Sequence, residues 1–154
     1  MSNEDRNVSS TPKSFADFEY KRYHLDLSSG DAHNESVRCE DYEDVFGGIA
    51  RGFKYLRGKA VDDAYDPQAA LIMNLGLLSG TDFMTGLRTY FLAYSPLKQS
   101  RTGKPSAMWS AGSGKFGTKL RYLDVDEVVM TGRSARPVLL HIHRHEEDGP
   151  PVFD

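Results

Sequence analysis

The sequence predicts an α+β domain, built on a mixed or antiparallel β-sheet with about two helices. Short runs of β type, either alternating or continuously apolar, recur between turns that contain glycine or proline. Helical spacing of apolar residues appears in two stretches, and strand-like runs precede both of them. The chain has 154 residues, a length that suits one domain.

A β-hairpin is predicted at the start of the folded region. Polar and apolar side chains alternate along residues 20–27, and the turn Ser-Ser-Gly-Asp at 28–31 leads to a second short run at 35–39. Cys39 ends that run and is the single cysteine. We therefore expect a buried structural thiol, with no internal disulfide and no iron–sulfur cluster held by this chain.

The next elements follow from caps, spacing and turn residues. Asp41 or Asp44 can cap a helix whose apolar positions recur every three or four residues as far as Leu56. Glycine and proline delimit the remaining elements. These are strands at 69–76 and 88–95, the second stopped by Pro96, a helix at 115–122, and strands at 127–132 and 136–143.

Composition indicates a globular protein, since 27% of the residues are charged and 39% are apolar. The net charge of −3 disfavours nucleic-acid binding, and the absence of a long apolar run disfavours a membrane span. We expect a cytoplasmic protein, with a flexible N-terminal extension at 1–16, a folded domain at 17–145 and a C-terminal tail at 146–154.

Two glycine-containing loops are candidate anion sites. The segment 109–120 resembles a phosphate-binding loop, but Trp109 and Phe116 occupy positions where a P-loop requires glycine and a hydroxyl residue. A tight turn before a helix can still present backbone N–H groups to an anion. In the segment 75–97, glycine turns precede Arg88, whose planar guanidinium suits phosphate or carboxylate. Ordinary connecting loops remain an alternative for both.

A histidine-rich strand is the third candidate site. His141, His143 and His145 share one face at a period of two, a spacing that can bring two imidazoles to one metal ion. A polar strand end or an interface strand is the alternative. No serine stands on a nucleophile turn and no acidic pair is placed by spacing, so we assign no catalytic residue.

The order of four segments resembles the N-terminal region of the aldehyde ferredoxin oxidoreductase family. The segments are LDLSSGD at 25–31, GGIARGFKYL at 47–56, GLLSGTDFMTGLRTYFLAYSPL at 76–97 and the stretch 110–142. These enzymes use tungsten, sometimes molybdenum, and in them this region begins the domain that carries a metal bis-pterin cofactor. The resemblance implies that 17–145 is such a domain and that its two loops bind the cofactor through Gly80, Thr81, Thr85, Gly86, Arg88, Ala111, Gly112, Ser113 and Gly114.

The chain departs from the family pattern at several positions. Leu77 and Met84 replace prolines, Leu87 replaces a glycine, and Ala111 replaces an asparagine. Large side chains at 83, 84 and 87 are expected to crowd a ligand that approaches the backbone.

The resemblance implies a small subunit, or a split N-terminal part, of a tungsten or molybdenum bis-pterin oxidoreductase acting on aldehydes or related substrates. A larger catalytic chain, or a second copy, is expected to cover sheet edges and an apolar face left bare. The chain alone is not expected to be a complete enzyme. The alternatives are a degenerate, cofactor-free scaffold that forms homo-oligomers, and a histidine-strand metal-binding protein.

Overall fold

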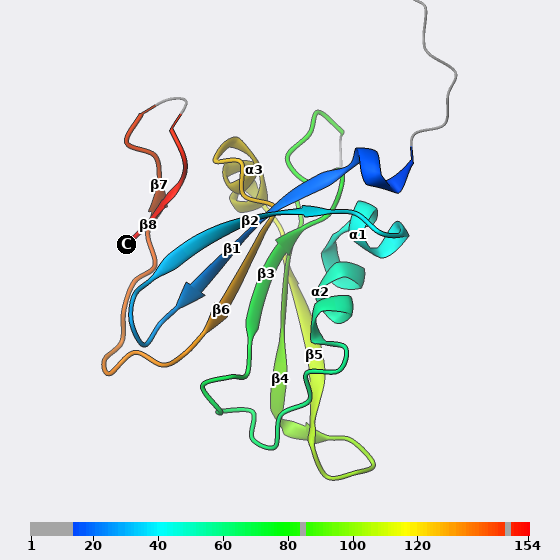
Figure 1. Ribbon diagram of the computed structural model, residues 1–154, viewed down its shortest axis with the longest axis vertical. Coiled ribbons are helices and arrows are strands. Elements are labelled where there is room, and N and C mark those ends of the chain that lie inside the picture. The colour runs from blue at the N-terminus through cyan, green and yellow to red at the C-terminus, as the bar shows by residue number, and fades with distance from the viewer. Residues whose placement is uncertain (1–13, 84–85, 147–148) are drawn as a thin grey trace, which may run out of the picture.

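The computed structural model describes residues 14–83, 86–146 and 149–154, and it confirms the predicted α+β class (Figure 1). Within these residues a six-stranded sheet has the order β2-β1-β6-β3-β4-β5. Its strands are β1 (Glu19–Asp26), β2 (Ala32–Arg38), β3 (Leu71–Leu75), β4 (Thr89–Gln99), β5 (Pro105–Gly112) and β6 (Glu127–Thr131). The β1–β6 pair is parallel and the other pairs are antiparallel, so the sheet is mixed.

The predicted hairpin is present, and its strand β1 also pairs with the distant strand β6. Tyr20 lies opposite Val37 across the hairpin, and Gly30 closes the turn with a φ of 81°, a conformation that suits glycine. On the other side of β1, Arg22 lies opposite Glu127. This parallel pairing joins segments far apart in the sequence, and it places β6 between β1 and β3.

One predicted helix is two helices, α1 (Tyr42–Phe46) and α2 (Gly48–Leu56). Asp41 caps α1, because its carboxylate accepts a hydrogen bond from the backbone N–H of Asp44 at 3.2 Å. The helix then breaks at Gly47, which has a φ of 64° and approaches Gly76 in an isolated β-bridge. A Cβ at Gly47 would lie 2.4 Å from the Leu75 carbonyl oxygen, so only glycine permits this contact.

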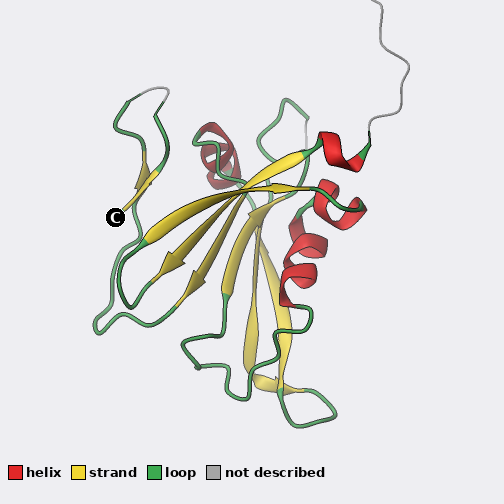
Figure 2. Cartoon of the chain, viewed as in Figure 1, coloured by secondary structure: helices red, strands yellow, loops and turns green. Residues whose placement is uncertain are grey.

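Helices cover both faces of the twisted sheet (Figure 2). On one face Leu56 of α2 packs in a cluster with Ala70, Ile72, Leu92, Tyr94 and Val129. On the other face Leu120 of α3 (Lys115–Tyr122) packs in a cluster with Tyr23, Met73, Leu75, Val125 and Val128. The expectation of a bare apolar sheet face is therefore wrong for β3, whose alternating side chains are buried on both sides within this chain.

The structure differs from the sequence-based expectation at β4 and adds the strand β5 beside it. Strand β4 continues past Pro96, because an irregularity in the β4–β5 register absorbs the proline. The Ser95 hydroxyl accepts hydrogen bonds from the N–H groups of Leu97 at 3.2 Å and Lys98 at 3.0 Å. The strand that pairs with β4, β5, was not predicted, because its segment lacks a strong apolar pattern and forms an edge of the sheet.

Residues 136–141 do not form the predicted strand, and Val138 and Leu139 are exposed. Both neighbours of β6 are already occupied by β1 and β3, so the sheet offers the following segment no edge to join there. Instead β7 (Ile142–His143) pairs with β8 (Val152–Phe153), which lies in the predicted tail. Among the described residues, no helix has the length and apolar character required to span a bilayer.

Candidate functional site

The two glycine-containing loops meet at one end of the sheet. Thr89 lies opposite Gly112 in the antiparallel pairing of β4 with β5. The backbones of Arg88, just before Thr89, and of Ser113, just after Gly112, therefore lie next to each other. Helix α3 begins directly after, at Lys115. Figure 1 shows the 76–88 loop and α3 at the same end of the sheet. The two segments predicted as anion sites therefore lie at the same end of the sheet.

The 76–88 loop closes on itself through short contacts. The buried Ser79 hydroxyl donates to the Arg88 carbonyl oxygen at 2.7 Å and accepts from the Gly76 N–H at 3.2 Å. The Gly80 N–H donates to the Gly86 carbonyl oxygen at 2.7 Å. A Cβ at Gly86 would lie 2.0 Å from the carbonyl oxygen of Leu78. Gly86 is therefore required by the closing of the loop itself.

Arg121 of α3 holds this loop in place, a role that the sequence did not predict. Its guanidinium donates to the carbonyl oxygens of Ser79 and Gly76, each at 3.1 Å, and it pairs with Asp126. Gly80 packs against the same residue, since a Cβ there would lie 2.6 Å from Arg121 Cβ. The loop is thus a fixed structure anchored to α3.

The polar side chains of the loop differ in whether they form hydrogen bonds or ion pairs within the domain. The Thr81 hydroxyl donates to the Leu78 carbonyl oxygen at 2.8 Å, so it serves the loop turn. Thr85 and Met84 lie outside the described residues. The Arg88 side chain is exposed and forms no ion pair with another residue in the part of the chain that the structure describes.

Arg88 borders an open groove of about 470 Å³ at the mouth of the loop. The groove is lined by side chains and backbone from α1, the 76–88 loop and β4, namely Phe46, Gly76, Leu77, Leu78, Ser79, Gly86, Arg88 and Tyr90. Its walls are largely apolar, and the guanidinium provides the cation. Such a surface suits a ligand or partner with an apolar body and an anionic group.

The second loop presents backbone donors at the start of α3. Ala111 and Gly112 belong to β5, while Gly114 is the N-cap of α3 with a φ of 111° and no side-chain capping bond. A Cβ at Gly114 would meet no atom within 4 Å, so the backbone there is open to approach. Uncapped N–H groups at a helix N-terminus attract anions.

A buried charge cluster, which the sequence also did not reveal, supports the base of the site. Glu127 is fully buried, and its carboxylate lies 2.6 Å from Arg22 Nε and 3.4 Å from Arg51 Nε. Arg51 also donates to the carbonyl oxygens of Leu75 and Asp126, at 3.3 and 3.1 Å. It therefore links α2 to the strand that leads into the 76–88 loop. Local sequence gives no signal for this cluster, because its members come from α2 and two different strands.

Tyr20 closes this cluster on one side. The Arg51 guanidinium lies over the Tyr20 ring, 4.0 Å from its centroid, and the Tyr20 hydroxyl accepts from Arg22 at 2.8 Å. Burial, together with the Glu127 carboxylate, raises the pKa of Tyr20 to about 12. The phenol therefore stays protonated at neutral pH.

The histidine candidate lies elsewhere, on the hairpin formed by β7 and β8. His141 and His143 are stacked with ring centroids 4.5 Å apart, and His145 contacts His143 edge-on at 4.7 Å. The nearby carboxylate of Asp154 was missed, because the preceding segment resembled a frayed tail rather than a pairing strand.

Comparisons with known proteins agree with this architecture. The family profile described as aldehyde ferredoxin oxidoreductase, N-terminal domain, matches residues 22–148. The tungsten-containing aldehyde ferredoxin oxidoreductase of Pyrococcus abyssi is 33% identical over 123 residues, and that of Pyrococcus furiosus is 30% identical over 125. Each alignment covers 77% of this chain and 19% of the relative.

A solved structure also matches, the active site complex BamBC of benzoyl coenzyme A reductase in complex with 1,5-dienoyl-CoA. It superposes with a TM-score of 0.66 and 25% identity, covering 81% of this chain and 19% of the matched chain. The chain thus spans about a fifth of the length of these relatives. The family profile covers most of the chain, and we conclude that the chain belongs to the aldehyde ferredoxin oxidoreductase family, matching its N-terminal domain.

Proposed function

We propose that this chain is a small subunit, or a split N-terminal part, of a tungsten or molybdenum bis-pterin oxidoreductase. In this role it contributes part of the cofactor-bearing domain to a larger catalytic chain. The observation that carries the proposal is the exposed Arg88 guanidinium at the groove beside the 76–88 loop, within a chain whose residues 22–148 match the family's N-terminal domain. The family membership makes a pterin phosphate the preferred anion for that position.

The residues present fit the anionic part of such a cofactor. Arg88 supplies an exposed guanidinium without an ion-pair partner among the described residues, and Gly114 leaves open space beside the first N–H groups of α3. Each offers a separate contact for an anion, Arg88 from the groove that it shares with Phe46 and Tyr90, and Gly114 from the start of α3, which packs on the other face of the sheet. When bound, the metal pterin supplies the redox chemistry, and this chain orients the cofactor without a catalytic residue of its own.

A larger partner is supported by the surface around the groove. Leu77, Leu78 and Leu87 are exposed beside Arg88, with 42%, 47% and 41% of their surface accessible. In the relatives this region is 19% of a much longer chain, whose remainder can cover such a surface. The proposed partner is accordingly a chain that carries the rest of the catalytic unit.

A cofactor-free scaffold is the second candidate, and the same leucines favour it. Leu87 occupies the family's glycine position next to Arg88, and Phe83 of the same loop is 66% exposed. Gly80 and Gly86 are used by contacts within the domain, so they need not serve a ligand. This surface would then pack against a second copy of the chain.

Purification from the native source distinguishes the two candidates. Affinity capture of the tagged chain, followed by mass spectrometry and elemental analysis, identifies any larger partner and any tungsten or molybdenum. A stoichiometric larger chain with either metal supports the first candidate. A metal-free homodimer at micromolar concentration in sedimentation supports the second, and a stable monomer without partner would contradict both.

A further inference from the structure

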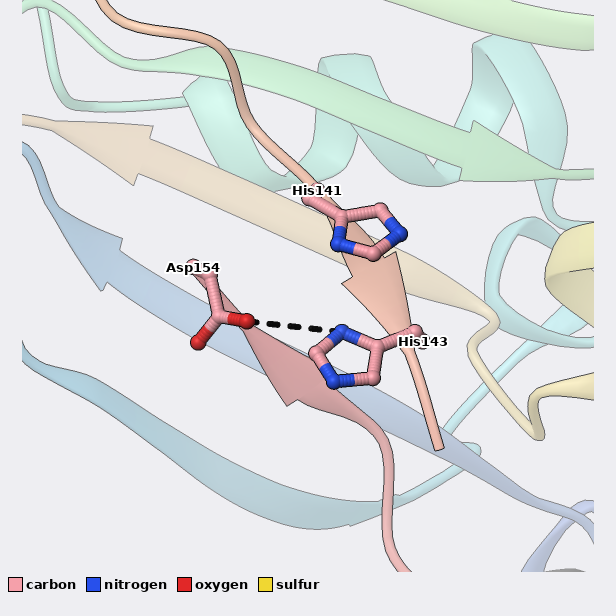
Figure 3. Close-up of side chains that lie close together, drawn as sticks. All are labelled: His141, His143 and Asp154. Carbon is pink, nitrogen blue, oxygen red and sulfur yellow. Dashed lines mark ion pairs between the residues drawn. The ribbon is translucent and has the colours of Figure 1, made fainter. Parts of the chain in front are cut away.

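The hairpin of β7 and β8 gathers three metal-ligating side chains on one side. His141 and Asp154 face each other across the pair, since each backbone N–H donates to the other's carbonyl oxygen, at 2.9 and 3.0 Å. Side chains alternate along a strand, so His143 shares the side of His141. Figure 3 shows the two stacked imidazoles with the Asp154 carboxylate beside them.

The spacing of these groups approaches that of a metal centre. The potential ligand atoms of His141, His143 and Asp154 all lie within 4.8 Å of one another. His143 Nδ1 is 3.5 Å from Asp154 Oδ2, close to the separation of about 3.4 Å between neighbouring ligands of tetrahedral zinc. His143 Nδ1 is also buried and makes no hydrogen bond of normal geometry with the described residues. A coordinated ion would satisfy it.

We propose that His141, His143 and Asp154 bind a divalent transition metal ion, preferentially Zn²⁺. Two imidazoles with one carboxylate suit zinc, whereas Mg²⁺ and Ca²⁺ prefer oxygen ligands alone. Three protein ligands leave one tetrahedral position for water or for a donor from a partner. The site is separate from the 76–88 loop and does not depend on the proposed cofactor role.

The position of the site indicates what the ion would do. Ile142 and Phe153 alternate with the ligands and pack against the sheet cluster that contains Leu120. The ligands come from both strands of the hairpin, so a bound ion would join β7 to the residue that follows β8. It would thereby fix this two-stranded cover on the sheet and raise the stability of the domain.

A second stacked histidine pair provides a matched control. His24 and His33 have ring centroids 4.8 Å apart, and Glu35 lies 3.3 Å from His24 Nε2. However, Glu35 also contacts Arg22 at 3.5 Å, and these residues do not form a close ligand group. The substitution His33→Asn therefore tests whether any stacked pair of histidines binds metal.

The test is a calorimetric titration of the chelator-treated 154-residue chain with Zn²⁺, together with Co²⁺ absorption spectra. We expect one ion per chain, a tetrahedral Co²⁺ spectrum, and a higher melting temperature with Zn²⁺. His143→Ala and Asp154→Asn are each expected to weaken Zn²⁺ binding at least about tenfold. His33→Asn is expected to leave the affinity unchanged.

Several results would overturn the proposal. These are a wild-type chain that binds no stoichiometric Zn²⁺, ligand variants that bind as tightly as the wild type, or an equal loss in His33→Asn. Circular dichroism verifies the fold of each variant. If His143→Ala does not fold, His141→Gln replaces an exposed side chain and must show the same loss.

Discussion

Removing the charge of Glu127 should destabilise the domain strongly. Its carboxylate is fully buried and lies 2.6 Å from Arg22 Nε and 3.4 Å from Arg51 Nε. In Glu127→Gln the side chain keeps its size, but the Arg51 guanidinium, whose side chain is 5% exposed, loses its anionic partner. Breaking a buried pair in this way costs about 3–5 kcal/mol. That is a large part of the stability of a domain of this size, which is about 5–15 kcal/mol.

Urea unfolding followed by circular dichroism measures this cost, and Glu35→Gln is the matched control. Glu35 also contacts Arg22, at 3.5 Å, but its side chain is 51% exposed. Exposed pairs contribute about 0–1 kcal/mol, so the control should lie close to the wild type. If both variants lose the same small amount of unfolding free energy, the buried cluster stabilises the fold no more than an exposed ion pair does.

Three further predictions concern the loop, its anchors and pH. Arg88→Ala should lower the tungsten or molybdenum content of the purified complex, because a charge-assisted contact contributes about 1.5–3 kcal/mol; unchanged metal content would exclude this role. Gly86→Ala should lower the unfolding free energy by about 1–3 kcal/mol, because its Cβ would lie 2.0 Å from the Leu78 carbonyl oxygen. Gly112→Ala is the control and should change the unfolding free energy little, because its Cβ would lie 3.6 Å from the nearest atom. The pKa of Tyr20 is raised from 10.0 to about 12, which favours the protonated phenol in the folded state, so the stabilising contribution of Tyr20 should be lost between about pH 10 and 12. The urea midpoint of Tyr20→Phe should therefore depend less on pH in this range than that of the wild type. An equal dependence of the two midpoints on pH would contradict this prediction.

Local pattern predicted most of the sheet because burial imposes a period on the sequence. Residues 71–75 form a strand whose two faces are both covered, and their continuous apolar character indicated this. Strand β5 has no such pattern, since it is an edge strand with Trp109 half exposed. The break at Gly47 also depends on a tertiary contact, the close approach to Leu75, which helical spacing alone does not reveal.

The candidate site was predicted in its parts but not in its assembly. The sequence indicated Arg88 and the 111–114 turn separately, and the β4–β5 register places their backbones at the same end of the sheet. Arg121 and Glu127 act through partners distant in the sequence, so no motif marks them. Asp154 was missed for the same reason, because its role depends on the pairing of β7 with β8.

The glycines that match the family pattern are constrained in two different ways in this structure. At Gly80 and Gly86 a side chain would collide with Arg121 and with the Leu78 carbonyl oxygen, so the fold alone requires glycine there. At Gly114 no atom lies within 4 Å of an added Cβ, but its φ of 111° is a backbone conformation that favours glycine. Loss of the cofactor would therefore leave all three glycines constrained by the fold, the first two through close contacts and the third through its backbone conformation. Cofactor contact is consequently tested at Arg88, whose exposed side chain can be replaced without disturbing the loop.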